Sequence, residues 1–142
     1  MIRYLIDTNI LSEPLVARPD ARVVERLMQH QGEMATGTPV IHELMYGAER
    51  LPPSRRRAEL ELYITRDVVE ALKVLPYDSR AAVWHARERY RLERRGYVPK
   101  VSDGQIAAIA AVNELILVTD NVKDFDRFEG LTIENWFTAR LH

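Results

Sequence analysis

Apolar residues in this chain occur in two patterns, as short and nearly continuous runs and as longer segments with helical spacing. The first run, Ile2 to Ile6, is interrupted only by Arg3 and predicts a strand buried on both faces, as in a parallel sheet. The longer segments repeat apolar residues on one helical face, which predicts amphipathic helices. Strands are predicted at 2–6, within 33–37, and at 72–75, 116–119 and 131–133; helices are predicted at 8–13, 20–32, 38–51, 54–70, 78–96 and 102–112.

This alternation of strands and helices predicts an α/β fold, a three-layer α/β/α sandwich around a short, mostly parallel sheet. We expect a single domain over residues 1–142, because the chain contains no internal repeat, low-complexity tract or linker. A chain of this length buries about two thirds of its unfolded surface, so a core is feasible without staples. Trp136 and Phe137 are expected to close that core.

Composition narrows the class of protein. Cysteine is absent, which excludes a disulfide scaffold and a thiolate metal site and fits a reducing compartment. The net charge of −1 gives no global basic field, so any nucleic acid must be bound by a local patch or through a metal. No apolar run approaches the roughly 18 residues of a membrane span, and no signal peptide is recognisable. We therefore expect a cytoplasmic protein without membrane contacts.

Acidic residues occupy the ends of the predicted elements. Asp7 ends the first strand, and Asp103 lies at the start of a helix, within a Ser102–Gln105 capping-box pattern. Asp120 and Asp124 follow the strand at 116–119. In a parallel sheet the carboxyl ends of strands and the amino ends of the following helices share one edge, so these acids should converge. Glu43, which lies off the predicted buried stripe of its helix, is a further candidate.

Each of these acids also has a structural explanation, since Asp7 and Asp103 could simply cap helices and Glu43 could face solvent. Their coincidence at one predicted edge favours function over these separate explanations. Carboxylates crowded in one pocket repel one another and need a cation. Oxygen donors without Cys or clustered His favour Mg²⁺ or Mn²⁺ over Zn²⁺. Such an ion orients and acidifies a water and stabilises charge on phosphate, which is what phosphodiester hydrolysis requires.

The chain also resembles a known family, the PIN domain, and in particular the VapC-type toxins of toxin–antitoxin pairs. The resemblance implies a metal-dependent endoribonuclease that forms a homodimer. It also implies an inhibitory antitoxin that binds the toxin in a hetero-oligomer. The toxin would then contact operator DNA only through the antitoxin. The matching motifs are Tyr4-Leu5-Ile6-Asp7-Thr8-Asn9, Glu43-Leu44 with Tyr46-Gly47, Ser102-Asp103 with Gln105-Ile106-Ala107-Ala108, and Val118-Thr119-Asp120-Asn121-Val122-Lys123-Asp124-Phe125.

The resemblance implies roles for individual acids. Asp7 and Asp103 would be the principal metal ligands, and Glu43 would bind the metal directly or through a water that it positions. Many relatives carry an Asp two residues after the Thr, where this chain has Asn121. Asp120 comes one residue early, so we take Asp124, one helical turn further, as the fourth acid.

Polar neighbours of these acids complete the predicted site. They would hydrogen-bond the metal ligands or the waters around the ion. These residues are Thr8, Asn9, Thr119, Asn121 and Asp120.

Two other functions remain open from the sequence. A receiver-like module that binds Mg²⁺ and accepts phosphate on Asp is one, although Asp7 has no acidic neighbour before it. A non-catalytic relative that binds only a partner or nucleic acid is the other. The sequence does not identify the RNA or the antitoxin, nor whether one or two metal ions bind.

Three further groups of residues have both a functional and a structural interpretation. The arginines between Arg80 and Arg95, with Lys100, either contact RNA phosphates or form a solvated face with pairs such as Arg89–Glu93. Apolar helix positions such as Met45 and Tyr46 either receive an antitoxin helix or belong to the core. Histidines show no ligand spacing and are interpreted as surface or core-edge residues, and the tryptophans as packing residues: His30, His42, His85, His142, Trp84 and Trp136.

Overall fold

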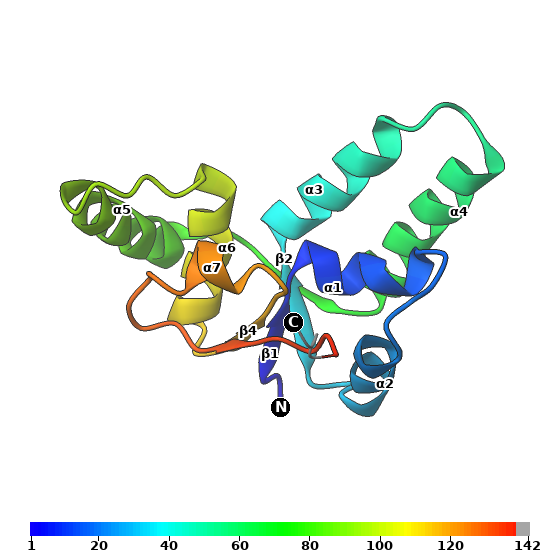
Figure 1. Cartoon of the computed structure of the whole chain (residues 1–142), viewed down its shortest axis with the longest axis horizontal. Coiled ribbons are helices and arrows are strands. Elements are labelled where there is room, and N and C mark those ends of the chain that lie inside the picture. Colours follow the sequence, from blue (N-terminus) through cyan, green and yellow to red (C-terminus); the bar gives the residue numbers. More distant parts are fainter. Residues whose placement is uncertain (139–142) are drawn as a thin grey trace.

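The computed structural model describes residues 1–138 and shows strands alternating with helices, as predicted (Figure 1). His142 lies outside the described residues. Among residues 1–138, no helix combines the length and apolar character needed to cross a membrane. The elements are β1 (Tyr4–Ile6), α1 (Thr8–Ser12), the 3₁₀ turn η1 (Glu13–Leu15), α2 (Ala21–Gln29), β2 (Met34–Gly37), α3 (Thr38–Glu49), α4 (Arg55–Tyr63), the π-helical segment η2 (Ile64–Glu70), β3 (Lys73–Leu75), α5 (Ser79–Arg94), α6 (Val101–Val112), β4 (Ile116–Val118), α7 (Val122–Phe125) and β5 (Ile133–Glu134).

The sheet has five parallel strands in the order β3-β2-β1-β4-β5. The central strand β1 is buried along its whole length, and Leu5 pairs with Ala35 of β2 on one side and Leu117 of β4 on the other. The continuous apolar run that predicted this strand is therefore explained by burial on both faces. Because all strands run in one direction, their carboxyl ends share one edge of the sheet.

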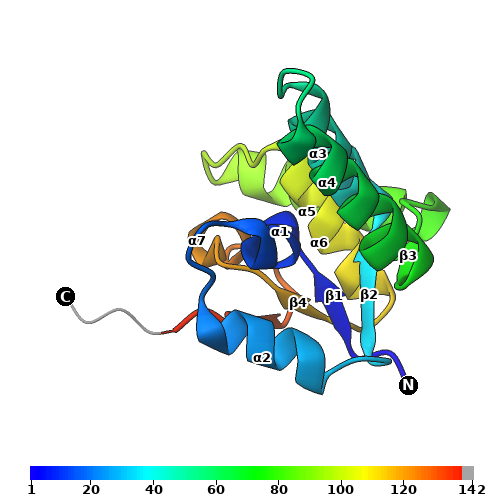
Figure 2. The ribbon, with the colours of Figure 1, turned by 90° about the vertical axis from the view of Figure 1, so that its right-hand side faces the viewer.

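Helices cover both faces of the sheet. Figure 1 shows α1, α2 and α4 on one side of the strands and α5, α6 and α7 on the other. Figure 2, seen from the first side, shows α1, α2 and α4 in front of the strands. Helix α3 leaves the carboxyl end of β2 and rises beyond the sheet. This arrangement confirms the predicted α/β fold with its central parallel sheet.

One hydrophobic core joins both faces of the sheet. Trp136 is only 1% exposed and packs edge-on against Tyr4, with ring centroids 5.1 Å apart. His30 stacks on Trp136 and also contacts Tyr4, so the three rings form one cluster. The prediction that Trp136 closes the core is confirmed, whereas Phe137 is only partly buried.

Two predicted helix starts are wrong in detail. The hydroxyl of Thr38 before Pro39 predicts Thr38 as an N-cap, but Thr38 is the first residue of α3 and the N-cap is Gly37. Helix α6 begins at Val101 with Lys100 as its N-cap, and no side chain caps it. The Ser102–Gln105 capping box does not form, because Ser102 already lies inside the helix and its hydroxyl cannot accept as an N-cap.

Candidate metal centre

Asp7 is the acid with the most hydrogen bonds among the four candidates at the carboxyl edge of the sheet. It follows β1 directly, is 4% exposed, and accepts three hydrogen bonds. One carboxylate oxygen accepts from the Thr8 backbone N–H at 2.8 Å; the other accepts from Thr119 Oγ1 at 2.8 Å and from Asn9 Nδ2 at 3.2 Å. Asp7 is thus the N-cap of α1 and is also held toward β4, so its carboxylate has a fixed orientation.

Burial dominates the electrostatics of Asp7. It raises the pKa of this carboxyl above its ordinary value, the charge of Glu43 raises the pKa further, and the three donors oppose the rise. The side chain is therefore a carboxylate for which a nearby positive charge would be strongly favourable.

The loop after β4 is bound to α1 by backbone groups. Asn9 Oδ1 accepts from the Asp120 N–H at 2.9 Å, and Thr119 Oγ1 accepts from the Asn121 N–H at 3.1 Å. The Asp120 side chain is exposed and accepts from Asn135 Nδ2 at 3.3 Å. The structure therefore brings Thr119 and Asn9 to Asp7, whereas the Asp120 carboxylate is engaged elsewhere.

Glu43 reaches the same edge from α3. Its Oε2 accepts a hydrogen bond from Thr8 Oγ1, which joins α3 to the first residue of α1. Thr8 thus contacts two acids, since its backbone N–H donates to Asp7 while its hydroxyl donates to Glu43.

Asp103 lies half-buried in the first turn of α6 and completes the cluster. Burial raises its pKa to about 6, and the charges of Asp124, Asp7 and Glu43 add to the rise, while Lys100 opposes it. The charges of Asp7, Glu43 and Asp124 thus all act on Asp103, although these acids come from the end of β1, from α3 and from α7. Among residues 1–138, no hydrogen bond restrains the Asp103 carboxylate, which sets it apart from Asp7.

The donor chemistry of this cluster fits a hard divalent cation. All four acids offer oxygen, and their mutual repulsion is relieved by a positive charge. Within residues 1–138, no three Asp, Glu or His side chains already stand together as an ion-binding group. The acids therefore act on one another electrostatically without already forming an ion-binding group within residues 1–138.

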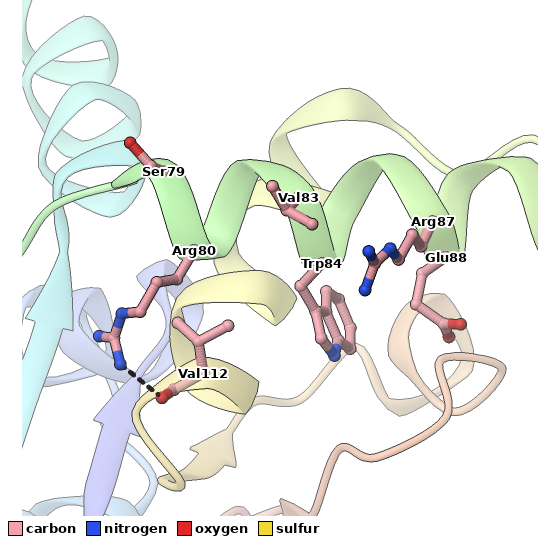
Figure 3. A pocket seen from close by; sticks show the side chains of 7 residues that line it. All are labelled: Ser79, Arg80, Val83, Trp84, Arg87, Glu88 and Val112. Atoms are coloured by element: carbon pink, nitrogen blue, oxygen red, sulfur yellow. Dashed lines mark hydrogen bonds between the residues drawn. The ribbon is translucent and has the colours of Figure 1, made fainter.

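Other predicted groups have a structural explanation. The arginines of α5 include Arg89, which pairs with Glu93 at 3.1 Å, and Arg91, which pairs with Glu88 at 2.8 Å. Trp84 packs against Phe128, with ring centroids 5.9 Å apart. A surface cavity of about 650 Å³ lies along α5, away from the acids; Figure 3 shows its lining residues, Ser79, Arg80, Val83, Trp84, Arg87, Glu88 and Val112.

Sequence reasoning missed the environment of His85. This residue is 5% exposed, and burial, with a smaller effect of Arg89, lowers its pKa, so the imidazole is neutral at pH 7. Its Nδ1 lies 2.8 Å from Tyr77 Oη, and its ring edge packs on Gly104, next to Asp103. A glycine in the first turn of an alanine-rich helix was the available signal for such a close approach.

Comparisons with known proteins identify the family of this chain. Residues 4–131 match the model of the PIN domain. A tRNA(fMet)-specific endonuclease VapC from Shigella flexneri is 36% identical over 137 residues, which cover 96% of this chain and 99% of that protein. Another tRNA(fMet)-specific endonuclease VapC, from Salmonella typhimurium, is 34% identical over the same shares of the two chains.

Solved structures show the same fold. The DNA-bound VapBC complex from Salmonella typhimurium contains a chain that superposes with a TM-score of 0.79 at 34% identity, covering 96% of this chain and 99% of that one. VapBC2 from Rickettsia felis, bound to a promoter DNA fragment, gives a TM-score of 0.80 at 26% identity, covering 96% and 99%. Because these matches identify a family of ribonucleases, the receiver-like alternative is set aside. The chain therefore belongs to the PIN domain family and, within it, to the VapC-type ribonucleases of toxin–antitoxin systems.

Proposed function

We propose that the chain is the toxin of a toxin–antitoxin pair and cuts RNA at the edge formed by Asp7, Glu43, Asp103 and Asp124. The observation that carries this proposal is that acids from separate elements meet at this edge: Thr8 joins Asp7 to Glu43 by hydrogen bonds, and the charges of Asp7, Glu43 and Asp124 raise the pKa of Asp103. Strongly perturbed carboxylates at the carboxyl edge of a parallel sheet mark a functional site.

Mg²⁺ or Mn²⁺ is the cation that this donor set suits. Asp7 and Asp103 would hold it, with Glu43 and Asp124 near enough to bind it or its waters. When bound, such a cation lowers the pKa of a water and stabilises the charge on the phosphate. The hydrogen bonds from Thr8, Asn9 and Thr119 keep the Asp7 oxygens in one orientation throughout.

Glu43 is suited to the proton transfer. One of its oxygens accepts from Thr8 Oγ1, and the other, which has no hydrogen bond among residues 1–138, can accept a proton from an attacking water. Water that attacks phosphorus in line displaces the ribose 3′-oxygen. The products are then a 5′-phosphate and a 3′-hydroxyl, and the ribose 2′-hydroxyl takes no part.

The substrate and partners follow from the relatives. The two VapC proteins named above are tRNA(fMet)-specific, which makes initiator transfer RNA the first substrate to test. The solved relatives are complexes with an antitoxin and, in part, with promoter DNA. We infer a cognate antitoxin, a homodimer within a hetero-oligomer, and contact with operator DNA only through the antitoxin.

Incubation with total RNA and with initiator transfer RNA, in Mg²⁺ with and without EDTA, tests this function. We expect cleavage that EDTA abolishes, with 5′-phosphate ends on the fragments. Asp7→Asn should remove the activity, and Asp120→Asn is the matched control, because that side chain contacts Asn135 instead of the cluster. Cyclic-phosphate ends or EDTA-resistant cleavage would contradict the mechanism, and folded protein without cleavage of any RNA would support the non-catalytic alternative.

A further inference from the structure

The start of α6 is held by packing instead of by a cap. Its N-cap, Lys100, makes no side-chain hydrogen bond, and Ser102 does not serve as a cap. The Asp103 carboxylate, one turn into the helix, has no hydrogen bond among residues 1–138 to fix it. The position of the Asp103 carboxylate therefore depends on the contacts that fix the first turn of α6.

The side chain that packs on this turn is His85 of α5. A Cβ added at Gly104 would lie 2.5 Å from His85 Cδ2 and 3.0 Å from Cε1, and closer still to Nε2. Real Cβ atoms do not approach other atoms so closely, so glycine is required for the helix to stand where it does. The contact lies one residue beyond Asp103.

Tyr77 fixes the imidazole in turn. Its hydroxyl lies 2.8 Å from His85 Nδ1, and the two rings meet edge to face with centroids 5.8 Å apart. Tyr77 comes from the connection between β3 and α5 and is partly buried. The ring that abuts Gly104 therefore has its orientation set by a residue outside both helices.

The other end of α6 is also joined to α5. Arg80, in the first turn of α5, donates to the carbonyl of Val112 at 3.4 Å, the contact drawn in Figure 3, and to Asn113 Oδ1 at 3.4 Å. Among the helices of the described chain, α5 and α6 share the most extensive contact. Helix α5 thus holds α6 by Arg80 at its far end and by His85 at the end that carries Asp103.

We propose that His85 is a positioning residue for the metal centre, which sets the distance of Asp103 from Asp7 through its contact with Gly104. This inference rests on the proposed function, because it assigns His85 a role in the same site. A displaced first turn would move Asp103 away from Asp7, while Asp7 would stay in place because its own hydrogen bonds hold it.

A size-exchange experiment tests this role, with Mn²⁺ binding measured by calorimetry on the purified full chain. Gly104→Ala should weaken Mn²⁺ binding about tenfold or more, because its methyl overlaps the imidazole. The double variant His85→Ala, Gly104→Ala should bind Mn²⁺ more tightly than Gly104→Ala alone, since the space for the methyl is restored. Tyr77→Phe, which keeps the ring and loses the hydroxyl, should have a smaller effect.

Gly47→Ala is the matched control. It is also a glycine-to-alanine change within a helix, but an added Cβ there meets nothing within 4 Å. Its Mn²⁺ dissociation constant should equal that of the native chain. His85→Ala carries the test if Gly104→Ala does not fold: a positioning role weakens Mn²⁺ binding by the folded protein, whereas a packing role lowers only the unfolding temperature.

Two results would overturn the proposal: native Mn²⁺ affinity in His85→Ala, or a double variant that folds and binds no better than Gly104→Ala. Asp7→Asn in the same titration separates this failure from failure of the proposed function. If Asp7→Asn loses Mn²⁺ binding while the His85 and Gly104 variants keep it, the metal centre stands and the positioning role is wrong. If Asp7→Asn also binds normally, the metal centre itself is wrong.

Discussion

The two principal acids of the site are held in opposite ways. Asp7 is buried and accepts three hydrogen bonds from α1 and the loop after β4, so its orientation is built into the strand edge. Asp103 is half-buried, its carboxylate has no hydrogen bond among the described residues, and its position depends on the packing of α6. We call Asp7 with its hydrogen-bond donors the rigid half of the site. We call Asp103, whose position depends on helix packing, the adjustable half. Changes at Asp7 should therefore act directly, and changes at Asp103 should depend on pH and on helix packing.

The largest effect is expected from Asp7→Asn. The amide keeps the volume of the side chain but removes the charge, so RNA cleavage in Mg²⁺ should fall by about a hundredfold or more. The chain should remain folded, because the Asn oxygen still accepts one of the existing hydrogen bonds. Cleavage rates and circular dichroism measure the two effects, and retention of activity would show that the rigid half is not part of the site.

Thr119→Val removes a hydrogen bond to Asp7 while leaving all four acids unchanged. Valine has nearly the same shape but cannot donate to Asp7 Oδ2 or accept from the Asn121 N–H. We expect a loss of about tenfold in activity and roughly 1–3 kcal/mol in the free energy of unfolding, since buried polar groups lose a partner. Thr119→Ser keeps the hydroxyl and is the control. Equal activity in both variants would argue against orientation of Asp7 by this hydroxyl.

The pH dependence should come from the adjustable half. The pKa of Asp103 is raised to about 6, so below that pH the cation must displace a proton. Mn²⁺ binding should therefore weaken by about tenfold for each unit of pH below 6 and level off above it. Calorimetric titrations between pH 5 and pH 8 measure this profile, and a flat profile would show that Asp103 is not a ligand.

The stability of the cation-free protein should change in the opposite direction. Because the raised pKa means that the native state binds more protons than the unfolded state, the free energy of unfolding falls as pH rises toward 6. Asp103→Asn should reduce this slope, with the raised pKa of Asp7 still contributing, and should stabilise the cation-free protein at pH 7 by roughly 1 kcal/mol, a value discounted for the partial exposure of the carboxylate. Urea denaturation at pH 4.5 and pH 7 measures both effects.

Asp124→Asn should have the smallest effect. Asp124 contributes the largest charge effect on the pKa of Asp103, so its removal should lower that pKa and shift the binding profile to lower pH. Asp120→Asn is again the control, since Asp120 does not contribute to the pKa of Asp103. A shift of equal size in both variants would contradict the choice of Asp124 as the fourth acid.

The sequence predicted the rigid half of this site better than the adjustable half. The buried run before Asp7 fixes a strand, and parallel topology brings its end to the same edge as Thr119. The position of Asp103 in a first turn was also predicted, because the Ser102–Gln105 pattern marks the start of the alanine-rich helix. The capping box failed, because α6 starts before Ser102 and packing, not a hydroxyl, defines its first turn.

The role of His85 could not be predicted, because it depends on the approach of two helices that are distant in space until the chain folds. A single histidine among arginines has no periodicity that distinguishes a buried ring from an exposed one. The orientation of Asp120 was equally hidden, since it depends on Asn135, fifteen residues later. Sequence patterns locate acids along the chain, while tertiary contacts decide which of them lie close to Asp7.

The central claim is that the rigid and adjustable halves hold one cation between them. Crystals grown with Mn²⁺ and measured for its anomalous scattering test this claim most directly. We expect one peak within about 2.5 Å of a carboxylate oxygen of both Asp7 and Asp103. A peak on either acid alone, or no peak at this edge of the sheet, would contradict it.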